Sequence, residues 1–96
     1  MSFRRAARKD ANHNEITDCF ISLGWSVLDI SQLKNACDAF VSKGSRTIAI
    51  EIKDGSKAPS QRKLSEGEEK FKNRWTGDWA LVESIDDVTY INNQTN

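Results

Sequence analysis

The residues best suited to chemistry in this chain are two carboxylates and a lysine: Asp38, Glu51 and Lys53. Glu51 and Lys53 lie at the end of an apolar segment that has the character of a β-strand. Side chains alternate along a strand, so these two point to one face, and Ile50 and Ile52 point to the other. Burying charges beside a core is costly unless they pair or hold a metal. The pattern therefore indicates metal-dependent hydrolysis of a phosphodiester.

Such hydrolysis requires a hard cation, because the negative phosphate oxygens repel a nucleophile and the cation presents an activated water. Mg²⁺ prefers oxygen ligands and keeps several waters, so one or two carboxylates and a carbonyl are sufficient. We expect Asp38 and Glu51 to meet across a hairpin and to bind the ion with the Ile52 carbonyl. Lys53 is expected to orient or deprotonate the attacking water and to offset charge in the transition state.

Each of these residues also has a structural interpretation. Glu51 and Lys53 form a surface ion pair, and Asp38 is a turn residue, if the strand end is exposed. Glu15 is a further candidate metal ligand, but Asn12 and Glu15 have the spacing of a capping box at a helix start. Both interpretations of Glu15 remain open from the sequence.

Other reactive side chains favour structural roles. His13 is the only histidine and is expected on the polar surface or beside a helix cap. Cys19 and Cys37 lack metal-ligand spacing and are expected as buried thiols in a reducing cytoplasm. Trp75 and Trp79 are expected in the core. A hydrolase triad or a zinc site has little support.

The elements that must position these residues form one domain, residues 1–96, with the order α-β-β-β-α-β. This order predicts an α/β fold with a small mixed sheet flanked by helices. Gly24 is expected to end the first helix, and Ser65 with Glu68 forms a capping box that starts the second. A short helix is expected to start near Ser84. The predicted ranges are a basic arm at 1–11, helices at 13–23 and 65–75, strands at 25–30, 37–41, 47–53 and 79–83, a loop at 54–63, and a frayed tail at 92–96.

The net charge of zero conceals an uneven distribution. Residues 1–74 carry all 14 Lys and Arg against 10 acids, which gives +4, whereas residues 75–96 carry four acids and no base. A local basic face is sufficient for phosphate contacts, so a neutral chain can still bind nucleic acid. No apolar run is long enough for a membrane span, and the basic, polar start is unlike a signal peptide. The expected DNA-backbone contacts are Arg4, Arg5, Arg8, Lys57, Arg62 and Lys63.

Several short blocks of sequence are found together in one nuclease family. The blocks are Arg5-Ala6-Ala7-Arg8-Lys9-Asp10-Ala11-Asn12 with Glu15-Ile16, Gly24, Asp38-Ala39-Phe40, Glu51-Ile52-Lys53-Asp54-Gly55, Arg62-Lys63-Leu64-Ser65 with Glu68, Phe71, and Trp75-Thr76-Gly77. Over roughly residues 4–90 the chain resembles a stand-alone VRR-NUC domain of the PD-(D/E)xK nuclease superfamily, of the compact kind often encoded by bacteriophages. The chain departs from that pattern at Cys37, where proline is usual, and at Glu68, where many relatives have glutamine; Gln61 lies nearby in sequence.

The resemblance implies a restriction-endonuclease-like core with Mg²⁺ or Mn²⁺ at Asp38 and Glu51, Lys53 as the catalytic lysine, and Glu15 as a helix-borne carboxylate near the metal. It implies a metal-dependent endodeoxyribonuclease that leaves a 5′-phosphate. It also implies a homodimer acting on branched DNA such as four-way (Holliday) junctions, in the host cytoplasm if the chain is phage-encoded. A symmetric junction needs two symmetric cuts, which a dimer provides. Backbone contacts carry little sequence information, so recognition is expected to depend on DNA shape.

Two other functions fit the same residues. The first is a DNA-binding module with this fold that cleaves nothing, for which a strong salt dependence without metal-dependent cutting is expected. The second is an interaction protein whose acidic C-terminal segment docks a partner, in which Glu51 and Lys53 form only an ion pair.

Overall fold

A mixed four-stranded sheet with strand order β1-β2-β3-β4 forms the middle of the fold. The computed structural model describes residues 9–95, so the predicted DNA contacts Arg4, Arg5 and Arg8 lie outside the described residues. β1 pairs antiparallel with β2, β2 pairs antiparallel with β3, and β3 pairs parallel with β4. The elements are α1 (His13–Ser22), β1 (Ser26–Asp29), β2 (Ala39–Lys43), β3 (Arg46–Ile52), a short 3-10 helix (Pro59–Gln61), α2 (Glu66–Arg74), β4 (Asp78–Val82) and α3 (Ile85–Asn93).

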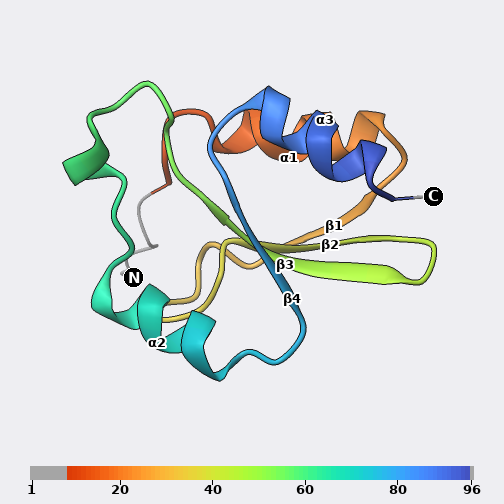
Figure 1. The fold of residues 1–96 in the computed structure, drawn as a ribbon. Helices are drawn as coiled ribbons and strands as arrows, with labels where there is room; N and C mark the ends of the chain where they lie inside the picture. Colours follow the sequence, from red (N-terminus) through yellow and green to blue (C-terminus); the bar gives the residue numbers. More distant parts are fainter. Residues whose placement is uncertain (1–8, 96) are drawn as a thin grey trace, which may run out of the picture.

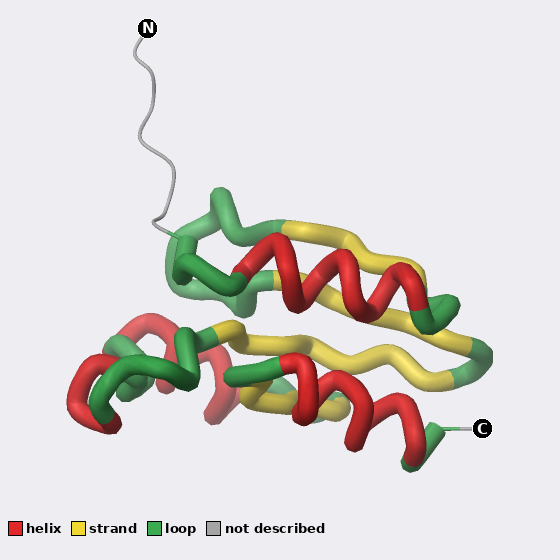
Figure 2. Tube along the Cα trace, turned by 90° about the horizontal axis from the view of Figure 1, so that it is seen from above, coloured by secondary structure: helices red, strands yellow, loops and turns green. Residues whose placement is uncertain are grey.

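The helices cover the two faces of the sheet unequally. α1 and α3 lie together on one face, and α2 lies on the other face near one end (Figure 1). Seen from above, α1 and α3 run side by side in the same direction along the strands (Figure 2). The described part of the chain therefore confirms an α/β fold with a small mixed sheet flanked by helices.

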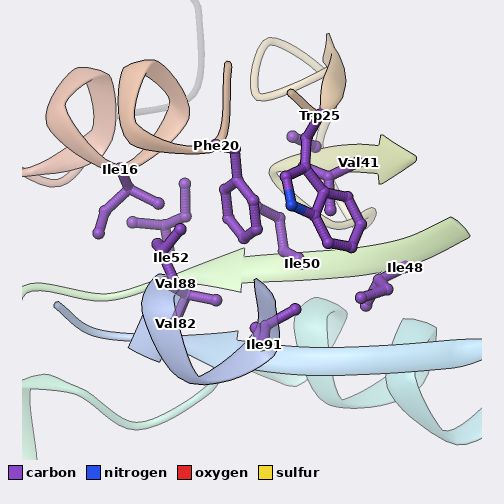
Figure 3. Close-up of a cluster of buried hydrophobic side chains, with 11 residues drawn as sticks. Ile16, Phe20, Trp25, Val41, Ile48, Ile50, Ile52, Val82, Val88 and Ile91 are labelled. Atoms are coloured by element: carbon purple, nitrogen blue, oxygen red, sulfur yellow. The ribbon is translucent and has the colours of Figure 1, made fainter. Parts of the chain in front are cut away.

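The main core lies between the sheet and the pair α1 and α3. Ile48, Ile50 and Ile52 alternate along β3 and are buried against Ile16 and Phe20 of α1 (Figure 3). Val88 and Ile91 of α3 close the same cluster. Because the isoleucines occupy every second position, the residues between them lie on the opposite face, as the sequence predicts for Glu51. That face is the one on which α2 lies.

Local sequence signals set the ends of the elements around β3. Gly24 has φ of +95° directly after the C-cap Leu23, and Gly44 has φ of +63° in the hairpin turn between β2 and β3. Ser65 and Glu68 form the predicted capping box: the Glu68 N–H donates to Ser65 Oγ at 3.2 Å, and the Ser65 N–H donates to Glu68 Oε1 at 2.8 Å. These signals are local, so the sequence is sufficient to predict them.

Two elements differ from the prediction by more than one residue. β2 spans Ala39–Lys43 rather than 37–41, although the Asp38 peptide still bonds both neighbouring strands: its oxygen accepts from the Ile30 N–H at 2.9 Å, and its N–H donates to the Ile50 oxygen at 3.0 Å. α3 is a helix of nine residues that extends to Asn93. The predicted tail from residue 92 onward therefore includes the end of α3, and Asn92 Oδ1 accepts from the Trp25 indole N–H at 3.0 Å.

His13 is buried, which contradicts the expectation of a polar surface residue, but it lies beside the N-cap Asn12, as the alternative expectation has it. Only 1% of His13 is exposed, and its Nε2 is 2.9 Å from Asp29 Oδ2. The partner on β1 is distant in sequence, so no local pattern could have indicated it. Within residues 9–95 the structure contains no helix with the length and apolar character needed to span a membrane.

Candidate catalytic site

The hairpin of β2 and β3 places Asp38 opposite Glu51, as the sequence predicts. Ala39 pairs with Ile50, and the Asp38 N–H donates to the Ile50 oxygen at 3.0 Å, so residues 38 and 51 are the next facing pair. Asp38 Oδ2 also accepts from the Ile52 N–H at 2.7 Å. The Asp38 carboxylate is therefore held against the Ile52 peptide, whose carbonyl is the third predicted metal ligand.

Glu51 is a buried carboxyl group: only 2% of the residue is exposed. Burial raises the pKa of Glu51 far above its ordinary range, and hydrogen bonding to Glu68 and the negative charge of Asp38 raise it further. The Glu51 carboxyl therefore holds a proton at neutral pH when no cation is present. Burying a carboxyl group next to a second carboxylate destabilises the fold, and a bound cation would offset this destabilisation.

Lys53 lies beside this carboxyl pair and is held by Glu68. Its Nζ donates to Glu68 Oε1 at 2.8 Å, and the Lys53 side chain is 13% exposed. Burial lowers the pKa of Lys53, but the hydrogen bond to Glu68 and the surrounding carboxylates outweigh burial, so the pKa is raised. The amine is therefore an ammonium ion at neutral pH, which suits it to donate hydrogen bonds and offset negative charge.

Glu68 has two functions that the sequence analysis did not combine. It completes the capping box of α2, and it also accepts hydrogen bonds from Glu51 and Lys53. Burial raises the pKa of Glu68, but these hydrogen bonds and the Ser65 N–H outweigh burial, so the pKa is lowered. The sequence predicts the position of Glu68 in the cap. Its contact with Lys53 depends on the path of the loop after β3, which the sequence does not predict.

Asp10 is a further carboxylate near the site that the sequence analysis did not select. Partial burial raises its pKa; Lys53 acts against that shift, and Asp38 adds to it. These charge interactions place Asp10 in the electrostatic surroundings of Asp38 and Lys53. The signal in the sequence was a single acid within the otherwise basic arm.

Glu15 lies in the first turn of α1 and is exposed. The predicted capping box of Asn12 and Glu15 does not form, because the Asn12 side chain makes no cap hydrogen bond. The Asn12 amide instead donates to the Lys53 and Glu83 carbonyl oxygens at 3.1 and 3.2 Å, and so ties the start of α1 to the ends of β3 and β4. Glu15 lines a groove of about 550 Å³ with Asn12 and Glu83. Its role as a metal ligand stays a prediction.

The second group of predicted DNA contacts lies in the loop after β3. Lys57 and Lys63 are exposed. Arg62 instead pairs with Glu83 at 2.9 Å and donates through Nε to the Lys57 carbonyl at 2.8 Å. Gln61 is exposed in the 3-10 helix, and its N–H bonds the Ala58 oxygen at 2.8 Å.

Gly55 fixes the path of this loop as it leaves the site. Its N–H donates to the Glu83 oxygen at 3.1 Å, and a Cβ at this position would approach that oxygen to 2.7 Å. Only glycine allows this close approach. Gly55 therefore lets the chain after Lys53 pass close to the backbone at the end of β4.

The donors fit a small hard cation. Within residues 9–95 no three His, Cys, Asp or Glu side chains form a ready-made metal cluster. Mg²⁺ is commonly held by one or two carboxylates while it keeps several waters, so Asp38, Glu51 and a carbonyl are a sufficient set. A cation bound there would offset the cost of burying the Glu51 carboxyl beside Asp38.

Comparison with known proteins identifies no relative of this chain. No protein-family model, curated protein or solved structure matches it.

Proposed function

We propose that the chain is a metal-dependent endodeoxyribonuclease of the VRR-NUC type, within the PD-(D/E)xK superfamily. One observation carries the proposal: the hairpin places Asp38 against the buried carboxyl of Glu51, and Lys53 follows on the same strand face. A surface ion pair does not account for this arrangement. Glu51 is 2% exposed, and the partner of Lys53 is Glu68.

Asp38, Glu51 and the Ile52 carbonyl are the residues proposed to hold Mg²⁺ or Mn²⁺. The ion would neutralise charge on the phosphate and lower the pKa of a bound water. Asp38 is pre-positioned by its hydrogen bond from the Ile52 N–H, and Glu51 is fixed by the strand and by its burial. Glu15 remains a proposed ligand of a second ion, directly or through water.

Lys53 is proposed as the catalytic lysine. Its ammonium form supports a role in orienting the attacking water and offsetting negative charge on the phosphate, rather than in removing a proton. Glu68 is proposed as its positioning residue, since one carboxylate oxygen accepts both the Lys53 Nζ and the Ser65 N–H. The proposed reaction is in-line hydrolysis that leaves a 5′-phosphate.

Branched DNA, such as a four-way junction, is the proposed substrate, and a homodimer the proposed active form. The basic arm with Lys57, Arg62 and Lys63 would contact phosphates without reading base sequence. Two symmetric cuts in a junction call for two symmetric sites. A phage source and a cytoplasmic location belong to the same proposal.

A cleavage assay with a labelled four-way junction and a matched linear duplex tests this proposal. Each DNA is incubated with the protein in Mg²⁺, Mn²⁺ or EDTA, alongside Lys53→Ala. Lys70→Ala is the matched control, because Lys70 is a surface lysine whose side chain is 74% exposed. We expect metal-dependent, symmetric cutting of the junction that Lys53→Ala abolishes and Lys70→Ala retains.

DNA binding without cutting in every metal would reject the nuclease. It would leave a non-catalytic DNA-binding module with the same fold. In that case Lys53→Ala and Lys70→Ala, which each remove one positive charge, would change only DNA binding, and the salt dependence of binding would report the effect.

A further inference from the structure

The segment between β1 and β2, residues 31–36, lies at the edge of the proposed site. Residues from this segment line a groove of about 260 Å³ that reaches Asp38 and Glu68. Four of its residues, 32–35, are exposed, and among them Leu33 is 60% exposed. We call residues 31–36 the site loop.

The N-terminal end of the site loop is fixed by buried polar contacts. Ser31 is 5% exposed, and its N–H and hydroxyl both donate to Asp29 Oδ1, at 3.0 and 2.7 Å. The other oxygen of Asp29 bonds the buried His13 at 2.9 Å. The Leu33 N–H then closes a turn on the Ile30 oxygen at 2.9 Å. The buried histidine therefore serves to anchor this loop to α1.

The C-terminal end of the site loop packs against α2. Asn35 has φ of +62°, a left-handed conformation that is uncommon for a residue other than glycine. Its side chain lies directly over Gly67, where an added Cβ would collide with the Asn35 amide. The site loop is thus held at both ends, and the left-handed Asn35 separates Leu33 and Lys34 from Asp38 along the chain.

We propose that the site loop is the element that selects branched DNA, with Leu33 as an apolar wedge at the branch and Lys34 as a phosphate contact beside it. Exposed leucines often have no function. Leu33 differs from Ile21, which is similarly exposed but lies on α1 across the sheet from α2, because Leu33 lines the groove that contains two of the site carboxylates.

An apolar side chain presented by a rigid loop can separate a base step more easily at a branch, where stacking is interrupted on one side, than inside a duplex. In a continuous duplex the same insertion would require stacked bases to separate first. Leu33 would therefore favour branched over linear DNA, whereas Lys34 would strengthen binding to both. This inference rests on the proposed function for its substrate.

Binding measured in Ca²⁺ tests the loop separately from cleavage. The probes are the junction and the matched duplex, each with the fluorescent base analogue aminopurine at the branch or at the equivalent duplex position. The variants are Leu33→Ala and Lys34→Ala, with Ile21→Ala and Lys34→Arg as matched controls.

For the wild type and Ile21→Ala we expect a rise in aminopurine fluorescence on the junction. Leu33→Ala should lose that rise and about tenfold of the junction preference, with duplex binding unchanged. Lys34→Ala should weaken binding to both DNAs and reduce the salt slope by about one, and Lys34→Arg should restore it.

Equal fluorescence and equal junction preference in Leu33→Ala and Ile21→Ala would overturn the inference, and so would a wild type that binds neither DNA. A Leu33-dependent signal in a protein that cuts in no metal would support the loop inference and reject the nuclease. The two proposals therefore fail separately.

Discussion

At the scale of single residues, the burial of Glu51 lowers the stability of the metal-free fold at neutral pH. Its folded-state pKa lies above the ordinary value of 4.5, so the folded chain binds more protons than the unfolded chain at neutral pH. Stability from this group is therefore present at low pH and is lost as pH rises above the unfolded pKa. The metal-free protein should become less stable between pH 5 and pH 8 for this reason.

Glu51→Gln removes that pH dependence. The amide keeps the donor that faces Glu68 and Asp38 but cannot ionise, so we expect the free energy of unfolding in EDTA at pH 8 to rise by about 1–2 kcal/mol. Mg²⁺ should stabilise the wild type and not the variant. Urea unfolding at pH 5 and pH 8 measures both effects, with the exposed Glu69→Gln as control. A metal-free Glu51→Gln that is less stable than the wild type would contradict this account.

Glu68→Gln separates the positioning of Lys53 from helix capping. The amide oxygen can still accept from the Ser65 N–H, whereas the charge that holds the Lys53 ammonium is lost. We expect cleavage to fall by about tenfold to a hundredfold in kcat, with KM for DNA little changed. The free energy of unfolding should change by less than about 1 kcal/mol. An unchanged kcat would show that Glu68 only caps the helix.

Asp29 gives the opposite pH dependence. Burial alone would raise its pKa, but hydrogen bonds from the Ser31 hydroxyl and N–H and from His13 lower it from 3.8 to about 2. This stability is present above the unfolded pKa and is lost as pH falls from about 4 through about 2. The side chain is 38% exposed, so the effect is small. Asp29→Asn should unfold with a flatter acid dependence over that range, which circular dichroism at several pH values would measure.

At the scale of elements, the cap of α2 links folding to the site. Ser65→Ala removes the side-chain acceptor of the Glu68 N–H, so we expect a loss of about 1 kcal/mol in the free energy of unfolding. Ser65→Asp retains an acceptor and should recover most of it. Thermal unfolding of the two variants tests this, and equal destabilisation by both would contradict the cap.

Local patterns were sufficient to predict the elements that present the site. The alternation in β3 predicted that Glu51 opposes Ile50, and the capping box predicted where α2 begins. The facing of Asp38 and Glu51 followed from the hairpin. These features depend on neighbours in sequence, where propensity and periodicity act directly.

The contacts that the sequence left open are all long-range. Glu68 meets Lys53, His13 meets Asp29, and Asn12 bonds the Glu83 oxygen only because the folded sheet brings distant segments together. Asn12 illustrates the difference: its spacing to Glu15 favours a cap, but a tertiary partner takes its side chain instead. A local pattern cannot indicate which of two partners is nearer after folding.

At the scale of the whole molecule, a second polar cluster lies at the end of the sheet opposite to the proposed site. At the end away from the site, the Lys43 Nζ donates to the Leu23 oxygen at 2.8 Å and to Asn92 Oδ1 at 3.1 Å. The paired residues of β3 from Arg46 to Ile52 span about 20 Å, which separates this cluster from Glu51.

Asn92→Ala should therefore destabilise the protein without changing the reaction. It leaves the Trp25 indole N–H and the Lys43 ammonium without their shared acceptor, so we expect a loss of about 1–3 kcal/mol. kcat measured well below the unfolding temperature should match that of the wild type. A kcat that falls in proportion to stability would show that the two ends are coupled.

The three helices also share an orientation that bears on the proposed anionic substrate. α1 begins where Asn12 bonds the ends of β3 and β4, α2 begins at the capping box that holds Lys53, and α3 begins at Ser84, directly after β4. All three N-termini thus lie at the end of the molecule that carries the proposed site, as Figure 1 shows. Each helix carries a macrodipole whose positive end is its N-terminus. The backbone itself therefore supplies a positive field where the carboxylates of the proposed site gather, and no substitution of a side chain removes it.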